Sequence, residues 1–264
     1  MNNERTPTTS LPGGSVPSVS VPGGSVPSVS SHAVSSHAVS SPGLLVLVGG
    51  NEWRAGCSFD REILASKPGE AVTVVPTAAA FEGPDAVLAN ATKWFSELSA
   101  TVEPCRILTR NDANDQRFVD QLASAQIIYI AGGSAMHLWS VLRDSPAWEA
   151  MKNAWVNGAT IAASSAGAMV LADPMIDQRG GAFTLGLGLL PGIAVLPHAN
   201  VWSADRMRRT QKLAGASVSL LSIDEQTAAI RDPDGTWRVA GIGNAVLRRT
   251  SDAAPQLPGI AECQ

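Results

Sequence analysis

Residues 161–169 read Ile-Ala-Ala-Ser-Ser-Ala-Gly-Ala-Met, and this stretch carries the most information about the fold. An apolar run with β-branched residues at 159–161 leads into it, and small residues that can start a helix follow. A tight strand-to-helix turn of this kind, a nucleophile elbow, lifts one side chain above the edge of a sheet. The lifted residue here would be Ser165. Backbone N–H groups at the start of the following helix would face a developing oxyanion.

The elbow pattern is one residue short of the usual Gly-x-Ser-x-Gly, because Ala163 stands where the first glycine would be. The alternative interpretation is a turn of small residues that only lets a strand and a helix pack closely. A short motif is a hypothesis until its structural context agrees with it. The rest of the chain therefore has to decide between the two interpretations.

The composition is that of a soluble globular protein. The chain has 264 residues and a net charge of −4, with 45% hydrophobic and 16% charged residues, which suits one domain with a sizeable core. The mild acidity gives no electrostatic reason to expect nucleic acid or an anionic membrane as a partner. The first residues lack the apolar core of a signal peptide, and no run of about 18 apolar residues occurs. We therefore expect a cytoplasmic protein.

The cysteines and the glycines exclude several classes of site. Cys57, Cys105 and Cys263 are too few and too scattered for a disulfide framework or a zinc site, as in a protein of the reducing cytosol. No Gly-x-Gly-x-x-Gly opens the first helix, and no Gly-Lys-Ser/Thr occurs. We therefore expect no dinucleotide or nucleoside triphosphate site of these types.

Residues 1–41 differ in composition from the rest of the chain. Pro-Gly-Gly-Ser-Val-Pro-Ser-Val-Ser occurs twice in this segment, and Ser-Ser-His-Ala-Val then occurs twice. Pro, Gly and Ser at this density cannot bury enough surface to offset the loss of chain entropy, so we expect a disordered tail. We expect a single α/β domain over 42–250 and a flexible C-terminus over 251–264.

Short apolar runs bounded by turn residues predict buried β-strands. These runs lie at 44–48, 71–75, 126–130, 159–163, 193–196 and 218–223. Apolar residues at helical spacing predict a helix over 83–99, and a further helix is expected near 203–214. Strands that alternate with helices indicate an α/β fold with a mostly parallel sheet.

The predicted sheet places the candidate site residues at one edge. The turn Asp232-Pro-Asp-Gly235 predicts a hairpin, and hence an antiparallel edge to the sheet. In open α/β sheets, sites gather beyond the carboxyl ends of the strands. Ser165, Gly132-Gly133 and the residues that follow Leu196 would all lie there.

A serine hydroxyl is a weak nucleophile without a base, and the body of the chain offers two histidines. His137 lies in the first turns of a predicted helix, where packing is the usual role. His198 follows a strand end and a proline, so it should project into the loops above the sheet, and we expect it to be the base. The orienting carboxylate stays open between two places in the sequence. They are Asp173 or Asp177, as in the α/β-hydrolase order, and Asp224-Glu225.

The glycine pairs that follow two of the predicted strands have two interpretations. Gly132-Gly133 could bring the backbone close to a substrate and offer an N–H group to the oxyanion, beside that of Ala166. Alternatively, the pair only supplies a flexible strand-to-helix turn. The same two interpretations apply to Gly49-Gly50.

Eight segments in order resemble the dipeptidase E and cyanophycinase family of serine peptidases. The resemblance covers residues 43–231, most of the body. The segments are Val-Gly-Gly-Asn-Glu at 48–52, Val-Pro-Thr-Ala-Ala at 75–79, Arg-Asn-Asp-Ala-Asn-Asp at 110–115, Ile-Ala-Gly-Gly-Ser at 130–134, Ser-Ser-Ala-Gly-Ala at 164–168, Leu-Gly-Leu-Gly-Leu-Leu at 185–190, Pro-His at 197–198 and Ser-Ile-Asp-Glu-Gln-Thr-Ala at 222–228.

The resemblance implies a fold and a set of roles. The fold would be that of class I glutamine amidotransferases, a three-layer α/β structure with a mostly parallel sheet and helices on both faces. Ser165 would be the nucleophile, His198 the general base and Glu225 the group that orients the histidine. The N–H groups of Gly133 and Ala166 would form the oxyanion hole. Ser134 and Arg206 are the candidates for substrate binding.

The reaction implied is hydrolysis of a short peptide, such as an aspartyl dipeptide, through an acyl-enzyme, with no metal or cofactor. The expected partners are the peptide and a second copy of the chain in a homodimer, without nucleic acid or membrane. Two other functions stay open. One is an amide hydrolase of the glutamine amidotransferase type, although such enzymes use cysteine at the elbow, where this chain has Ser165. The other is a non-catalytic binding protein on the same scaffold.

Overall fold

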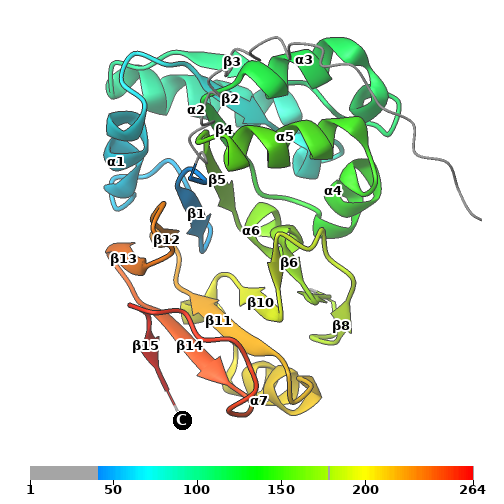
Figure 1. The fold of residues 1–264 in the computed structure, drawn as a ribbon, viewed down its shortest axis with the longest axis vertical. Helices are drawn as coiled ribbons and strands as arrows, with labels where there is room; N and C mark the ends of the chain where they lie inside the picture. Colours follow the sequence, from blue (N-terminus) through cyan, green and yellow to red (C-terminus); the bar gives the residue numbers. More distant parts are fainter. Residues whose placement is uncertain (1–40, 178, 264) are drawn as a thin grey trace, which may run out of the picture. The chain divides into compact units, whose positions relative to one another are not determined.

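A computed structural model describes residues 41–177 and 179–263, and Figure 1 shows their fold. The predicted low-complexity tail lies outside the described residues, except for Ser41. The domain bounds predicted for the chain stay predictions. Within the part of the chain that the structure describes, no helix combines the length and the apolar character that a membrane crossing requires.

The main sheet has seven strands in the order β13-β12-β1-β5-β4-β2-β3. Neighbours from β1 to β3 are parallel, whereas β12 runs antiparallel to β1 and β13 antiparallel to β12. The predicted parallel sheet with an antiparallel hairpin at its edge is thus confirmed. The strands are β1 (Leu45–Val48), β2 (Val72–Val75), β3 (Val102–Pro104), β4 (Ile127–Ile130), β5 (Thr160–Ser164), β12 (Thr227–Arg231) and β13 (Trp237–Gly241).

Helices cover both faces of this sheet, which gives the predicted three layers (Figure 1). Side chains alternate along β1, so Val46 and Val48 join one core while Leu45 and Leu47 join the other. The first core includes residues of α1 (Phe59–Ser66) and α2 (Pro84–Glu97). The second includes residues of α3 (Gln116–Ser124), α4 (Ala135–Leu142), α5 (Pro146–Val156) and α6 (Ala166–Leu171).

A second sheet of six strands has the order β15-β14-β11-β10-β6-β9. The predicted strands at 193–196 and 218–223 belong here, as a parallel pair, and do not join the main sheet. In the main sheet, the place beside β1 is taken by β12. The strands are β6 (Ala172–Asp173), β9 (Leu190–Pro191), β10 (Ile193–Leu196), β11 (Ser219–Ile223), β14 (Ala245–Arg249) and β15 (Ala261–Glu262). A separate pair is β7 (Met175–Ile176) with β8 (Phe183–Thr184), and α7 (Ala204–Leu213) lies between β10 and β11 in sequence.

The segment after residue 250 lies against the two sheets. β15 pairs in parallel with β14, and the N–H of Trp237 donates to the carbonyl oxygen of Pro258 at 2.7 Å. The side chains of Leu257 and Ile260 are buried. These contacts hold the segment in the described fold, and its expected flexibility stays a prediction.

Candidate active site

Ser165 lies at the turn between β5 and α6, at the carboxyl edge of the main sheet. Its backbone has φ 51° and ψ −112°, a combination that a side chain adopts only under strain. Its N–H donates to the carbonyl oxygen of Val48 at 2.9 Å, and the residue is 8% exposed. A Cβ on Gly167 would lie 2.7 Å from the carbonyl oxygen of Ile130, so the glycine after the serine is sterically required. Ala163, by contrast, packs fully buried within β5.

His198 reaches the serine from the end of β10. Its Nε2 lies 2.8 Å from the Oγ of Ser165. The residue has φ 54°, and its N–H donates to the carbonyl oxygen of Gly49 at 2.7 Å. The predicted nucleophile and base are therefore within hydrogen-bond distance. The other histidine, His137, places its Nε2 2.9 Å from the carbonyl oxygen of Leu108.

Glu225 lies on the far side of the imidazole ring. Its Oε1 is 2.8 Å from Nδ1 of His198, and its Oε2 accepts from Nδ2 of Asn51 at 3.1 Å. The backbone N–H of Glu225 donates to Oδ1 of Asn200 at 2.9 Å. The side chains of His198 and Glu225 are 31% and 23% exposed, so the pair is partly shielded from water.

The carboxylates that the sequence left as alternatives have other partners. Asp173 accepts from the N–H of Gly186 at 3.0 Å, and Asp177 pairs with Arg179. Asp224 accepts from the N–H of Asn244 at 2.9 Å. Glu225 is the acid that the structure places against His198.

The Gly-Gly turn after β4 is fixed by the N–H groups around Gly133. Those of Ala131 and Ser134 donate to the carbonyl oxygens of Val75 and Ala78, at 3.1 and 2.8 Å. The N–H of Gly132 donates to a side-chain oxygen of Glu52 at 3.2 Å. Among residues 41–177 and 179–263, no such partner is seen for the N–H of Gly133. That N–H group is thus the one in the turn that a ligand can use.

Gly133 itself could not be another residue. It has φ 136°, and a Cβ there would lie 2.4 Å from the carbonyl oxygen of Ala78. The other predicted oxyanion donor, Ala166, is the first residue of α6, where an N–H group has no partner within the helix. The two donors come from the ends of the neighbouring strands β4 and β5.

The two predicted substrate-binding residues have local structural contacts. Ser134 caps α4, because its Oγ accepts from the N–H of His137 at 3.3 Å. Arg206 lies on α7, and its guanidinium carbon is 3.7 Å from the centre of the Trp202 ring. Ser134 adjoins the oxyanion turn in sequence, and the role of both residues in binding stays a prediction.

Two residues of the site were not assigned a role from the sequence. Asn51 contacts Glu225, and Glu52 contacts both Gly132 and Ser164, the latter at 2.7 Å between carboxylate and hydroxyl oxygens. Both lie just beyond the carboxyl end of β1, on the same edge as the elbow. Polar residues that follow a Gly-Gly strand end are the signal that could have pointed to them.

The thiols are not arranged for nucleophilic chemistry. Burial raises the pKa of Cys57 to about 11 and the pKa of Cys105 to about 12, so both stay protonated near neutral pH. The elbow position holds Ser165. An amidotransferase-type cysteine nucleophile therefore has no support from these two residues.

Comparisons with known proteins identify the family. A model of peptidase family S51 matches residues 45–236. Cyanophycinase from Nostoc sp. is 28% identical over 222 residues, covering 77% of this chain and 72% of the relative. A cyanophycinase from Synechococcus elongatus is 29% identical over 150 residues, covering 52% of this chain and 46% of that relative.

Solved structures agree on the fold. A peptidase from an acI-B1 Actinobacterium superposes with a TM-score of 0.69 at 25% identity, covering 78% of this chain and 91% of that one. A candidate peptidase E from Listeria monocytogenes has a TM-score of 0.56 at 17% identity, covering 79% of this chain and 98% of that one. The chain thus belongs to peptidase family S51, the serine peptidases that include dipeptidase E and the cyanophycinases, as its motifs predict.

Proposed function

We propose that this serine peptidase hydrolyses short peptides through an acyl-enzyme, with Ser165, His198 and Glu225 as its catalytic triad. The observation that carries the proposal is a continuous hydrogen-bonded chain. Ser165 Oγ lies 2.8 Å from His198 Nε2, and His198 Nδ1 lies 2.8 Å from Glu225 Oε1. This is the nucleophile, base and orienting acid arrangement that activates a serine hydroxyl.

In the first half of the reaction, His198 accepts the hydroxyl proton while Ser165 Oγ bonds to the scissile carbonyl carbon. Glu225 holds the imidazole in the required tautomer and stabilises the imidazolium that forms. The carbonyl oxygen becomes negative and accepts hydrogen bonds from the N–H groups of Gly133 and Ala166. His198 then gives the proton to the leaving amine, and the C–N bond breaks.

In the second half, water takes the place of the amine. His198 removes a proton from the water, whose oxygen attacks the ester carbon of the acyl-enzyme. The bond to Ser165 Oγ breaks, and His198 returns the proton to that oxygen. The chain's own groups supply each proton transfer of this cycle.

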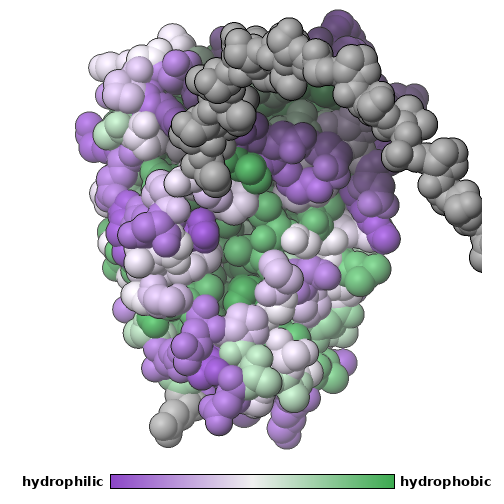
Figure 2. Space-filling view, viewed as in Figure 1, coloured by the Kyte–Doolittle hydropathy of each residue, from purple (hydrophilic) through white to green (hydrophobic). Residues whose placement is uncertain are grey.

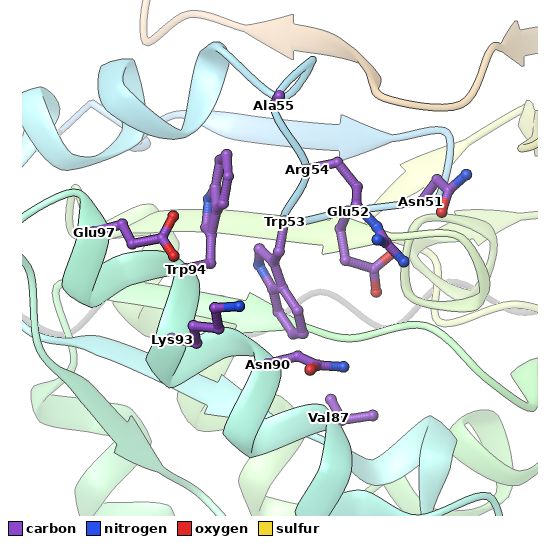
Figure 3. A pocket seen from close by; sticks show the side chains of 10 residues that line it. All are labelled: Asn51, Glu52, Trp53, Arg54, Ala55, Val87, Asn90, Lys93, Trp94 and Glu97. Carbon is purple, nitrogen blue, oxygen red and sulfur yellow. The ribbon is translucent and has the colours of Figure 1, made fainter.

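A pocket beside the site supports a short, charged peptide as the substrate. It has a volume of about 560 Å³ and lies between the loop at 51–55 and α2 (Figure 3). Asn51 and Glu52, which contact the triad acid and the oxyanion turn, also line this pocket. Arg54 and Lys93 bring two positive charges to its wall, and Glu52 and Glu97 bring two negative ones. Such a lining can pair with both the carboxylates and the free amine of a short peptide. We therefore propose aspartyl dipeptides as the substrate class.

The test is hydrolysis of α-aspartyl and β-aspartyl dipeptides by the wild type and by Ser165→Ala, followed by amine release. We expect Ser165→Ala to lose at least about 10⁴-fold in kcat. Its melting temperature should stay close to that of the wild type. Ser140→Ala, an exposed serine on α4, is the matched control and should keep full activity.

Three results would count against the proposal. The first is equal activity of Ser165→Ala and the wild type on these dipeptides. The second is activity that disappears in Cys57→Ala or Cys105→Ala but persists in Ser165→Ala, which would point to an amidotransferase-type thiol enzyme. A wild type that neither cleaves peptides nor reacts with a fluorophosphonate would point to a non-catalytic binding protein.

A further inference from the structure

One carboxylate joins the ends of two strands at the edge of the main sheet. The Oε2 of Glu52 accepts from the hydroxyl of Ser164 at 2.7 Å, and its Oε1 accepts from the N–H of Gly132 at 3.2 Å. Ser164 immediately precedes the proposed nucleophile. Gly132 immediately precedes the proposed oxyanion donor Gly133. Each contact of Glu52 is therefore one residue away from a group that is proposed to act on the substrate.

This bridge lies where the sheet itself no longer holds the two strands together. The ladder between β4 and β5 ends with Ile130 opposite Ala163. The two proposed oxyanion donors, Gly133 and Ala166, each lie three residues beyond that last pair. Their separation must match a single oxygen atom to within a few tenths of an ångström, because hydrogen bonds weaken outside a narrow range of distances. Glu52 links the two segments across this gap.

The backbone that carries Glu52 is itself fixed by the residues immediately before and after it. Its neighbour Asn51 has φ 55° and donates to Glu225, and its neighbour Trp53 has φ 59°. The ring of Trp53 lies 5.3 Å from that of Tyr129, a residue of β4. Figure 3 shows Glu52 and Trp53 directed from this loop toward the pocket. The loop is thus anchored on both the triad and the strand that carries the oxyanion turn.

We propose that Glu52 is a positioning residue, which fixes the distance between the oxyanion turn at Gly132-Gly133 and the elbow at Ser164-Ser165. This inference rests on the proposed function. Glu52 acts through Gly132 and Ser164 and does not touch the reacting atoms. It serves as a double hydrogen-bond acceptor, and its negative charge is not needed for that role.

Two substitutions of Glu52 test this role, because glutamine can keep both hydrogen bonds and alanine can keep neither. In Glu52→Gln, the amide oxygen still accepts from the N–H of Gly132, and the amide N–H₂ donates to the hydroxyl oxygen of Ser164, which can rotate its proton away. In Glu52→Ala, both links are lost. The glutamine variant should therefore keep the geometry of the site, and the alanine variant should lose it.

The experiment measures the rate constant and the stoichiometry with which a fluorophosphonate labels Ser165. This reaction uses the nucleophile and the oxyanion hole but does not depend on the peptide. We expect Glu52→Ala to label to completion about 10 to 100 times more slowly, which is below the loss from deleting an oxyanion donor outright. Glu52→Gln should stay within about threefold of the wild type. Glu103→Ala, an exposed carboxylate on β3, is the control and should match the wild type.

Peptide kinetics and thermal unfolding complete the test. For Glu52→Ala acting on an aspartyl dipeptide, kcat should fall while KM changes by less than about threefold. The reason is that both carboxylate oxygens of Glu52 are taken by Ser164 and Gly132, and Arg54 and Lys93 of the pocket are kept. If Glu52 only stabilised the fold, Glu52→Ala would instead lower the melting temperature and the labelled fraction. Ser164→Ala, which removes one of the two links, should give a smaller loss of rate and serves as the second variant.

The outcomes decide between the two proposals. Glu52→Ala labelling at the wild-type rate overturns the inference, and so does Glu52→Gln being as slow as Glu52→Ala, which would assign the effect to charge. If the wild type is labelled in a manner that depends on Glu52 but cleaves no peptide, the positioning role stands and the peptidase proposal fails. A wild type that neither is labelled at Ser165 nor cleaves the dipeptides overturns both.

Discussion

The backbone of Gly50 lies directly against the imidazole ring of His198. A Cβ on Gly50 would be 2.2 Å from Cε1 and 2.5 Å from Nε2 of that ring. The carbonyl oxygens of Gly49 and Gly50 also accept the N–H groups of His198 and Gln226, both at hydrogen-bond distance. The glycine pair Gly49-Gly50 after β1 therefore positions the proposed base, His198.

Gly50→Ala should displace the imidazole and lower kcat by about 100-fold, the scale of a 1 Å misplacement in an active site. The substitution also strains the backbone, because Gly50 has φ 106°. Gly69→Ala is the matched control, since Gly69 has φ 81° and nothing within 4 Å of its would-be Cβ. Both variants should lose about 1 to 2 kcal/mol of stability from φ alone. Only the first should lose activity, and equal activities would contradict the contact with His198.

The candidate site shows which of its residues can be predicted from the sequence. Ser165 could be predicted because small side chains surround it in the sequence, between a predicted strand and a predicted helix. His198 could be predicted because a strand end and a proline precede it. Both signals depend only on neighbours along the chain, and so do the buried apolar strands of the main sheet.

The remaining parts of the site depend on contacts between distant segments. Residue types alone do not decide between Asp173 or Asp177 and the pair Asp224-Glu225, and only the family resemblance favoured Glu225. Glu52 meets partners 80 and 112 residues away, which no local pattern records. In the same way, the apolar run of β10 predicts a strand but does not say which sheet it joins, because that depends on its pairing with β11, a distant segment of the chain.

Arg54 and Lys93 should favour acidic peptides if the pocket beside the site binds the substrate. Loss of one charge-assisted contact costs about 1.5 to 3 kcal/mol, which corresponds to roughly a tenfold to hundredfold weaker binding. We expect Lys93→Ala and Arg54→Ala to raise KM for aspartyl dipeptides by at least about tenfold, with little change for alanyl dipeptides. Lys152→Ala on α5 is the control. A uniform rise in KM for both peptide classes would contradict recognition of the acidic group.

Asp60 should make the stability of the protein depend on pH. Its side chain is fully buried, with Oδ2 accepting from Nε1 of Trp94 at 2.8 Å and no partner for Oδ1 among the residues that the structure describes. Burial raises the pKa of Asp60 from 3.8 to about 7, against the lowering effect of Trp94. The folded protein therefore binds a proton at this carboxyl that the unfolded chain has already lost near neutral pH.

The sign follows from this difference in protonation. The contribution of Asp60 to stability is fully present below the unfolded pKa of 3.8 and declines by about 1.4 kcal/mol per pH unit until the folded pKa of about 7 is passed. Asp60→Asn mimics the protonated form at every pH. In urea unfolding it should match the wild type near pH 4 and be more stable at pH 8, whereas Asp252→Asn, at an exposed site, should show no such trend. A difference that does not change with pH would mean that the pKa of Asp60 is the same in the folded and the unfolded protein.

The strained backbone of Ser165 can be measured by comparing glycine with alanine at that position. With φ 51° and ψ −112°, the residue adopts a conformation that costs about 1 to 3 kcal/mol for any side chain but little for glycine. Ser165→Ala keeps this strain and Ser165→Gly relieves it. At Ser164, inside β5, the same pair of substitutions has no strain to relieve, so glycine should be about 1 kcal/mol less stable than alanine there.

Urea unfolding of the four variants isolates the strain from the loss of the side chain. At each position, the free energy of unfolding of the glycine variant is compared with that of the alanine variant. This difference should favour glycine at position 165 over position 164 by about 1 kcal/mol or more. The fold would then hold the Ser165 hydroxyl within hydrogen-bond distance of His198 at a cost in backbone strain. If glycine is disfavoured equally at both positions, Ser165 is held by packing alone and the elbow stores no strain.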